Sequence, residues 1–160
     1  MSMLLGREAL RTAEPADMAE VRILLIDNDD LLLADVAGLG HPEIIAEALS
    51  SPDVEPISLA GRCDVLAINI DAPGGFELLE KVCRMRIGPP VIALAGQGIP
   101  GRTLEHVLIL AELRGAAMAL PKPIDADELA LAALRVLERR RPMSRSLAVL
   151  AEQLERRLAI

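Results

Sequence analysis

Short apolar runs that end at polar or turn residues recur along this chain, and they restrict its fold more than any other feature. They are VRILLID (21–27), DVLAIN (64–69), PVIALAG (90–96) and AAMALP (116–121). Each run is shorter than an ordinary helix and shows no alternation of polar and apolar residues. This pattern is typical of strands that are buried on both faces of a parallel sheet.

Helical patterns lie between these runs. They are predicted over residues 41–51, 75–86, 103–115 and 125–141. The first of them opens with Pro42, which suits the first turn of a helix. A further strand is predicted over 54–60, at an edge of the sheet because of Pro56. Strands that alternate with helices predict an α/β fold, a parallel sheet with helices on both faces.

The composition sets the kind of core and excludes two kinds of partner. The chain is 52% hydrophobic but has one Phe and no Trp or Tyr, so its core must be aliphatic. The net charge of −7 argues against non-specific nucleic-acid binding, which needs a basic face, and against an anionic membrane surface.

The expected location is the cytoplasm. No apolar stretch is long enough for a signal peptide or a membrane span. Cys63 and Cys83 lack metal-site spacing and are interpreted as thiols in a reducing compartment. The bias towards Ala, Leu, Arg and Gly suggests a bacterial, GC-rich genome.

In parallel sheets, ligands bind beyond the carboxyl ends of the strands. This rule directs attention to Asp27–Asp30, Asn69–Asp71, Ala95–Gly98 and Pro121–Pro123. The motifs ILLIDND, DVLAINIDAP, PVIALAG and GAAMALPKPID occur in an order that resembles the bacterial response-regulator receiver domain. The resemblance covers roughly residues 21–140 and is most specific in LPKPIDADEL.

The resemblance implies a flavodoxin-like, receiver-like doubly wound sheet of five parallel strands. It divides the chain into an N-terminal arm (1–20), a receiver-like domain (21–141) and a C-terminal helical extension (142–160). Little room remains for a second helix before the strand at 64–69, so we expect that helix to be reduced and an extra helix to follow the domain.

The resemblance also implies a set of site residues. In that family, acidic residues after the first strand hold Mg²⁺ together with a phospho-acceptor aspartate after the third. A lysine and a hydroxyl contact the phosphoryl group, and an aromatic side chain changes orientation in response to it. Asp27 and Lys122 match the first acid and the lysine. The second acid, the acceptor, the hydroxyl and the switch aromatic are replaced by Asn28, Asn69, Ala95 and Ala119.

These replacements indicate a degenerate receiver that no longer relays phosphate, because the Asn69 amide has no anionic oxygen to attack a phosphoryl group. The predicted function is a stand-alone, phosphorylation-independent signalling adaptor in a two-component-type pathway, without enzymatic activity or cofactor. Its expected partner is a histidine kinase or a downstream signalling protein, and a homodimer is a further possibility.

Two alternatives remain open. One is a working receiver that is phosphorylated at Asp71. The other is a small Mg²⁺-dependent phosphatase, because Asp-x-Asp after an apolar strand resembles the first motif of haloacid-dehalogenase-type phosphatases. That resemblance implies Asp27 as nucleophile and Asp29 as general acid. Weak candidates for a metal site are therefore Asp27, Asp29 and Asp71.

The tail presents a stripe of leucines at helical spacing, namely Leu147, Leu150, Leu154 and Leu158. The stripe either packs on the domain or pairs with a second copy or a partner helix. By resemblance alone, residues 103–140 form the expected interaction surface.

Overall fold

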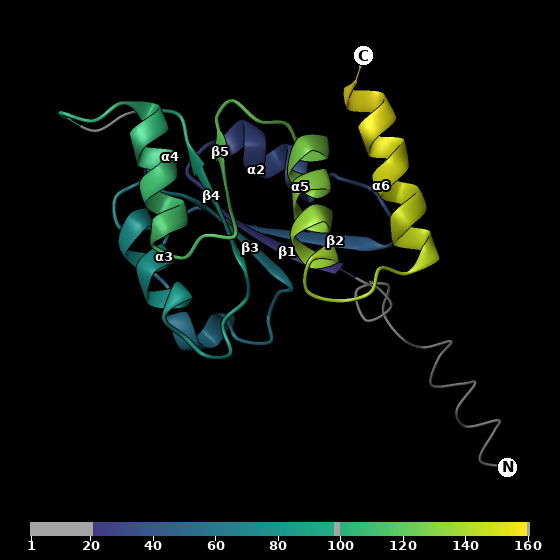
Figure 1. Ribbon diagram of the computed structural model, residues 1–160, viewed down its shortest axis with the longest axis horizontal. Coiled ribbons are helices and arrows are strands. Elements are labelled where there is room, and N and C mark those ends of the chain that lie inside the picture. Colours follow the sequence, from purple (N-terminus) through teal and green to yellow (C-terminus); the bar gives the residue numbers. More distant parts are fainter. Residues whose placement is uncertain (1–20, 98–99, 160) are drawn as a thin grey trace, which may run out of the picture.

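The computed structural model describes residues 21–97 and 100–159. Within them, parallel strands form one sheet in the order β2-β1-β3-β4-β5 (Figure 1). The strands are β1 (Val21–Ile26), β2 (Ile44–Leu49), β3 (Val65–Asn69), β4 (Val91–Ala95) and β5 (Met118–Pro121). The alternating pattern predicts the parallel sheet, and the receiver resemblance implies its flavodoxin-like, doubly wound arrangement; both expectations are confirmed. The predicted arm over 1–20 lies outside the described residues.

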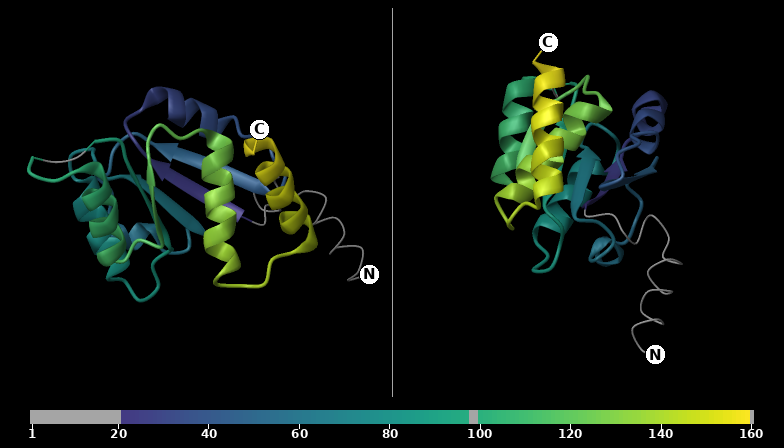
Figure 2. Two further views of the ribbon diagram at one scale, coloured as in Figure 1. Left: turned by 45° about the horizontal axis from the view of Figure 1, so that its top comes forward. Right: turned by 90° about the vertical axis from the view of Figure 1, so that its right-hand side faces the viewer.

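Helices cover both faces of the sheet. They are α2 (Asp30–Ala37), the 3₁₀ helix η2 (Pro56–Leu59), α3 (Gly75–Cys83), α4 (Leu104–Leu113), α5 (Ala126–Glu138) and α6 (Arg145–Leu158). One core layer lies under α2, α5 and α6, and the other lies under η2, α3 and α4 (Figure 2). No helix in these ranges is both long and apolar enough to cross a membrane.

The central strands explain why their sequences show no polar alternation. Successive residues point into opposite layers, so Ile23 and Leu25 join one core and Leu24 and Ile26 join the other. All four side chains are buried, because helices cover both sides. The apolar runs therefore identify buried parallel strands, as predicted.

The second strand corrects a prediction. The helix expected over 41–51 is wrong, since Ile44–Leu49 forms β2 and pairs in parallel along the whole of β1. Ala, Glu and Leu favour a helix in isolation, but tertiary pairing overrides this weak preference. Ile44 and Ala46 join one core layer and Leu49 joins the other, which is the alternation of a strand.

The connection from β1 to β2 contains a helix that was not predicted. In α2, the Asp29 carboxylate caps the N-terminus, with its Oδ1 accepting from the N–H groups of Leu31 (3.1 Å) and Leu32 (3.3 Å). The sequence DLLLADVA is apolar on most sides, which hides its helical period. The strand expected over 54–60 is also wrong, because η2 occupies Pro56–Leu59 as the reduced second helix.

The C-terminal helix α6 packs on its own domain. Leu147, Leu150 and Leu154 are 3%, 5% and 0% exposed and belong to the core layer that α5 covers. Ser144 caps the helix by accepting from the Leu147 N–H at 3.2 Å. Of the two roles considered for the leucine stripe, the structure shows packing on the domain, and these three side chains are not available to a partner helix. Leu158 is half-buried.

A tight turn joins β3 to α3. Gly74 has a left-handed φ of 83°. Gly75 begins the helix directly against the end of β3, where an added Cβ would lie far inside van der Waals contact of the Asn69 carbonyl oxygen. The turn therefore brings the start of α3 close to the polar end of the sheet.

Candidate functional site

The carboxyl ends of β1, β3, β4 and β5 surround a shallow polar hollow. Its volume is about 500 Å³. It is lined by Asn28, Asp29, Asn69, Asp71, Ala72, Gly96, Gln97, Lys122 and Pro123. Four of the six residues predicted for the acceptor pocket line this hollow, and a fifth, Asp27, is buried against Asn69 and Lys122.

Asp27 is the buried anion of the site. It is 1% exposed and both of its oxygens are engaged. Its Oδ2 accepts from the Lys122 ammonium at 2.8 Å. Its Oδ1 accepts from the Asn69 amide at 2.9 Å and from the Asp29 N–H at 3.0 Å. Three donors, one of them charged, compensate the desolvation of this carboxylate.

Asn69, the last residue of β3, makes hydrogen bonds with both the nitrogen and the oxygen of its side-chain amide. Its Nδ2 donates to Asp27 and to the Asn28 Oδ1, at 2.9 and 3.1 Å. Its Oδ1 accepts from the Asp71 N–H at 2.9 Å. An ionised carboxylate accepts hydrogen bonds and cannot donate them, so an aspartate could not make the first two bonds. The hydrogen bonds of this site therefore require an amide at position 69.

Asp71 turns away from Asp27 towards the loop after β4. Its Oδ2 accepts from the N–H groups of Gly96 at 2.6 Å and Gln97 at 3.1 Å. The residue is exposed, so its carboxylate remains in contact with solvent.

Lys122 lies between two carboxylates. Besides the close pair with Asp27, its ammonium is 3.7 Å from Asp29, whose other oxygen caps α2. The lysine therefore satisfies acidic groups within the site.

Alanines occupy the positions at which the receiver family has a hydroxyl and an aromatic side chain. Ala95 is fully buried at the end of β4, and Ala119 is half-buried in β5. A methyl group neither donates nor accepts a hydrogen bond. The two positions therefore offer nothing that a phosphoryl group could engage.

The residues present do not fit a Mg²⁺ site. Mg²⁺ is usually held by one or two carboxylates in near-octahedral oxygen geometry. Here Asp27 is engaged with Lys122 and Asn69, Asp29 caps a helix, and Asp71 faces the loop after β4. Among the described residues, no three His, Cys, Asp or Glu side chains lie together in a way that could hold a metal ion.

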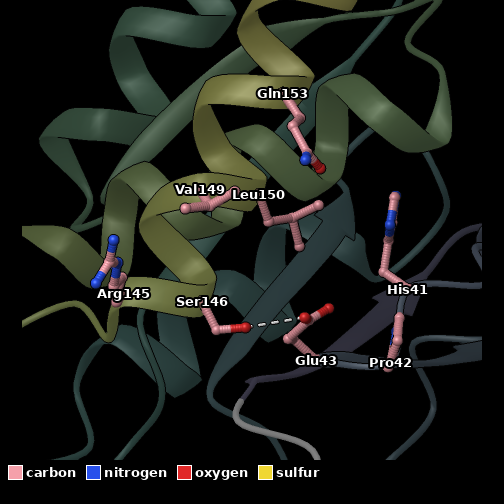
Figure 3. A pocket seen from close by; sticks show the side chains of 8 residues that line it. All are labelled: His41, Pro42, Glu43, Arg145, Ser146, Val149, Leu150 and Gln153. Carbon is pink, nitrogen blue, oxygen red and sulfur yellow. Dashed lines mark hydrogen bonds between the residues drawn. The ribbon is translucent and has the colours of Figure 1, made fainter.

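A second hollow, of about 520 Å³, lies away from this site, between the approach to β2 and α6. Figure 3 shows Val149 and Leu150 on its helical side and His41 and Glu43 on the other. The Ser146 hydroxyl donates to the Glu43 carboxylate at 2.9 Å across it. This bond fastens α6 to the strand side, so we interpret the hollow as a feature of helix packing.

Sequence reasoning named the side chains of the site but missed its backbone donors. Gly96 and Gln97 supply N–H groups to Asp71, and every residue except proline carries such a group. No side-chain signal could therefore have identified them as partners.

Solved structures similar to this chain include response regulators, and 130 chains of solved structures match it. NtrX from Brucella abortus in complex with ADP is 26% identical over 74% of this chain and 26% of its own, with a TM-score of 0.59. The chain spans about a quarter of the NtrX chain. A response regulator receiver domain protein from Clostridium thermocellum is 25% identical over 75% of this chain and 96% of its own, with a TM-score of 0.60.

The receiver domain of the Francisella response regulator 1452 is 22% identical over 76% of this chain and 99% of its own, with a TM-score of 0.61. At that identity it shows the fold alone. No family model matches the sequence, and no curated protein matches it.

Proposed function

We propose that this chain, which has the flavodoxin-like fold of response-regulator receiver domains, is a degenerate receiver. In this proposal it acts as a phosphorylation-independent protein-interaction adaptor in a two-component-type pathway. The observation that carries the proposal is the Asn69 amide, which stands at the acceptor position and donates to Asp27 and Asn28.

The chemistry of the pocket supports the proposal. A phospho-acceptor needs an anionic oxygen that is free to attack, and Asn69 has none. The nearest carboxylate, Asp27, is buried with both oxygens engaged by Lys122, Asn69 and the Asp29 N–H. These groups satisfy one another, and no buried side-chain N or O atom in the described residues lacks a partner.

The face that meets a partner is proposed on α4. Ile109 and Leu113 are 49% and 77% exposed there, within the span 103–140 that the receiver resemblance put forward. Large apolar side chains exposed together mark interaction sites more often than isolated ones do. The proposed partner is a histidine kinase or a downstream signalling protein.

The first test is the intact mass of the protein after incubation with acetyl phosphate and Mg²⁺, beside an Asp71→Asn variant. No gain in mass in either protein supports the proposal. A gain of one phosphoryl group in the unmodified protein overturns it.

The same measurement addresses the rival function, a receiver phosphorylated at Asp71. The observation in its favour is that Asp71 is exposed in the polar hollow. Phosphorylation that disappears in Asp71→Asn would establish this rival. Phosphorylation that persists would place the acceptor elsewhere.

A second test addresses the partner surface. Leu113→Ser should reduce the binding of a histidine kinase or other protein recovered with the unmodified chain. Val149→Ser on α6, which removes an apolar side chain that is 44% exposed, is the matched control and should leave binding unchanged. Equal losses in both variants would argue against α4 as the contact face.

A further inference from the structure

A carboxylate of the chain itself occupies the backbone donors of the loop that follows β4. Asp71 comes from the turn after β3, whereas Gly96 and Gln97 begin the connection from β4 towards α4. One oxygen of Asp71 accepts from both N–H groups, at 2.6 and 3.1 Å. The contact therefore links two segments about 25 residues apart in sequence.

Two successive N–H groups that converge on one point form an arrangement that binds anions. Bonds from such groups to a carboxylate are charge-assisted, and the 2.6 Å distance is short for N–H···O. In this chain the bound anion is the Asp71 side chain. The two N–H groups therefore have a negatively charged acceptor without any added ligand.

Gly96 lets the loop pass closely between two charged side chains. A Cβ at this position would lie 3.3 Å from the Lys122 Cβ and 3.6 Å from the Asp71 Oδ2. The first distance is tighter than nine in ten real Cβ contacts, whereas the second is an ordinary van der Waals contact. A side chain at this position would therefore press on Lys122, and glycine lets the loop run close beside the lysine.

Asn69 orients Asp71 for this role. The Asp71 N–H donates to the Asn69 Oδ1 at 2.9 Å, while the other end of that amide is held by Asp27 and Asn28. An amide has distinct donor and acceptor ends, so these bonds fix its orientation. The chain of contacts runs from the buried Asp27 through Asn69 and Asp71 to the loop.

We propose that Asp71 is a positioning residue, a built-in anion that holds the start of the β4–α4 loop in one conformation at all times. The inference rests on the proposed function and deepens it, because it names how the site is regulated. With Gly96 and Gln97 held permanently, no phosphorylation step is needed to set them. In this proposal the contact face on α4 is therefore available to a partner at all times.

The test is amide hydrogen exchange at Gly96 and Gln97, measured by NMR on the labelled protein. In Asp71→Ala both amides should exchange about tenfold faster or more, because two hydrogen bonds to a charged acceptor are lost. Asp71→Asn keeps an oxygen but not the charge, so its exchange should be intermediate. Asp53→Asn, at another exposed aspartate, is the matched control and should leave both amides unchanged.

Unchanged exchange in Asp71→Ala would overturn the inference. If that variant does not fold, the comparison of Asp71→Asn with Asp53→Asn decides in the same way. The proposed function fails separately, since a phosphoryl group taken up by the unmodified protein overturns it whatever the exchange rates are.

Discussion

The pair formed by Lys122 and Asp27 allows a quantitative prediction about stability. The Asp27 side chain is fully buried, and among the residues that the structure describes its one charged donor is Lys122, itself 15% exposed. Replacing Lys122 by Met keeps most of the side-chain volume but leaves a buried carboxylate with two neutral donors. We expect a strong loss of stability, because an uncompensated buried charge is costly.

The magnitude follows from the burial. Breaking a buried ion pair from one side costs about 3–5 kcal/mol, and the two remaining donors and the partial exposure of the lysine favour the low end. A loss of about 3 kcal/mol in a chain of this size corresponds to a fall in Tm of roughly 6–12 °C.

Urea and thermal unfolding followed by circular dichroism would measure this loss. Lys81→Met is a natural control, because Lys81 is the other lysine of the chain and is exposed on α3. Its effect should stay within about 0.5 kcal/mol. Adding Asp27→Asn to Lys122→Met removes the unpaired charge and should restore part of the stability. The reasoning is refuted if Lys122→Met is no more destabilising than Lys81→Met.

Three further predictions concern other parts of the fold. Gly75→Ala should destabilise the domain by several kcal/mol, on the order of a severe core defect, because the new methyl group meets the backbone carbonyl of Asn69. Urea unfolding beside Gly38→Ala would measure it, since Gly38 has a φ of −95° and an added Cβ there makes only an ordinary contact at 3.5 Å. Burial raises the pKa of the Cys63 thiol from 9.0 to about 12 and also raises the pKa of Cys83. Both thiols should therefore react slowly with iodoacetamide at neutral pH in the folded protein and rapidly in urea, as intact mass would report. Since the folded pKa of Cys63 is the higher one, its contribution to stability is full below about pH 9 and is lost as the pH rises towards 12, and a Cys63→Ala variant should lack this part of the pH profile. Leu154→Ala should cost about 2–5 kcal/mol, because the leucine is fully buried between α6 and the core; a negligible change in the unfolding midpoint would mean that α6 contributes little to the domain.

The sequence predicted the sheet well where burial leaves a clear signature. Apart from Arg22 in β1 and Asn69 at the end of β3, the β1, β3 and β4 segments are apolar, because helices cover both of their sides, and no helix of ordinary length fits them. In contrast, β2 is an edge strand with an exposed Glu47, so its sequence is not the continuous apolar run that marks a buried strand. Its alanines and glutamate resemble a helix, and pairing with β1 decided the outcome.

The candidate site was predicted at the level of residue identity but not of contacts. Asp27, Asn69 and Lys122 follow three different strands, and the rule that ligands bind at strand ends brought them together. The direction of Asp71 could not be predicted, because it depends on the backbone path of the loop at Gly96. A sequence pattern identifies which side chains gather but not which hydrogen bond each one makes.

The placement of α6 has a consequence for the order in which the molecule is completed during synthesis. Its leucines share a core layer with Ile44 of β2, and Ser146 bonds to Glu43, 103 residues earlier in the chain. A ribosome adds about 5–20 residues per second, so the early strand waits roughly 5–20 s for this cover. During that time the apolar side chains beside Ile44 that α6 later buries remain uncovered.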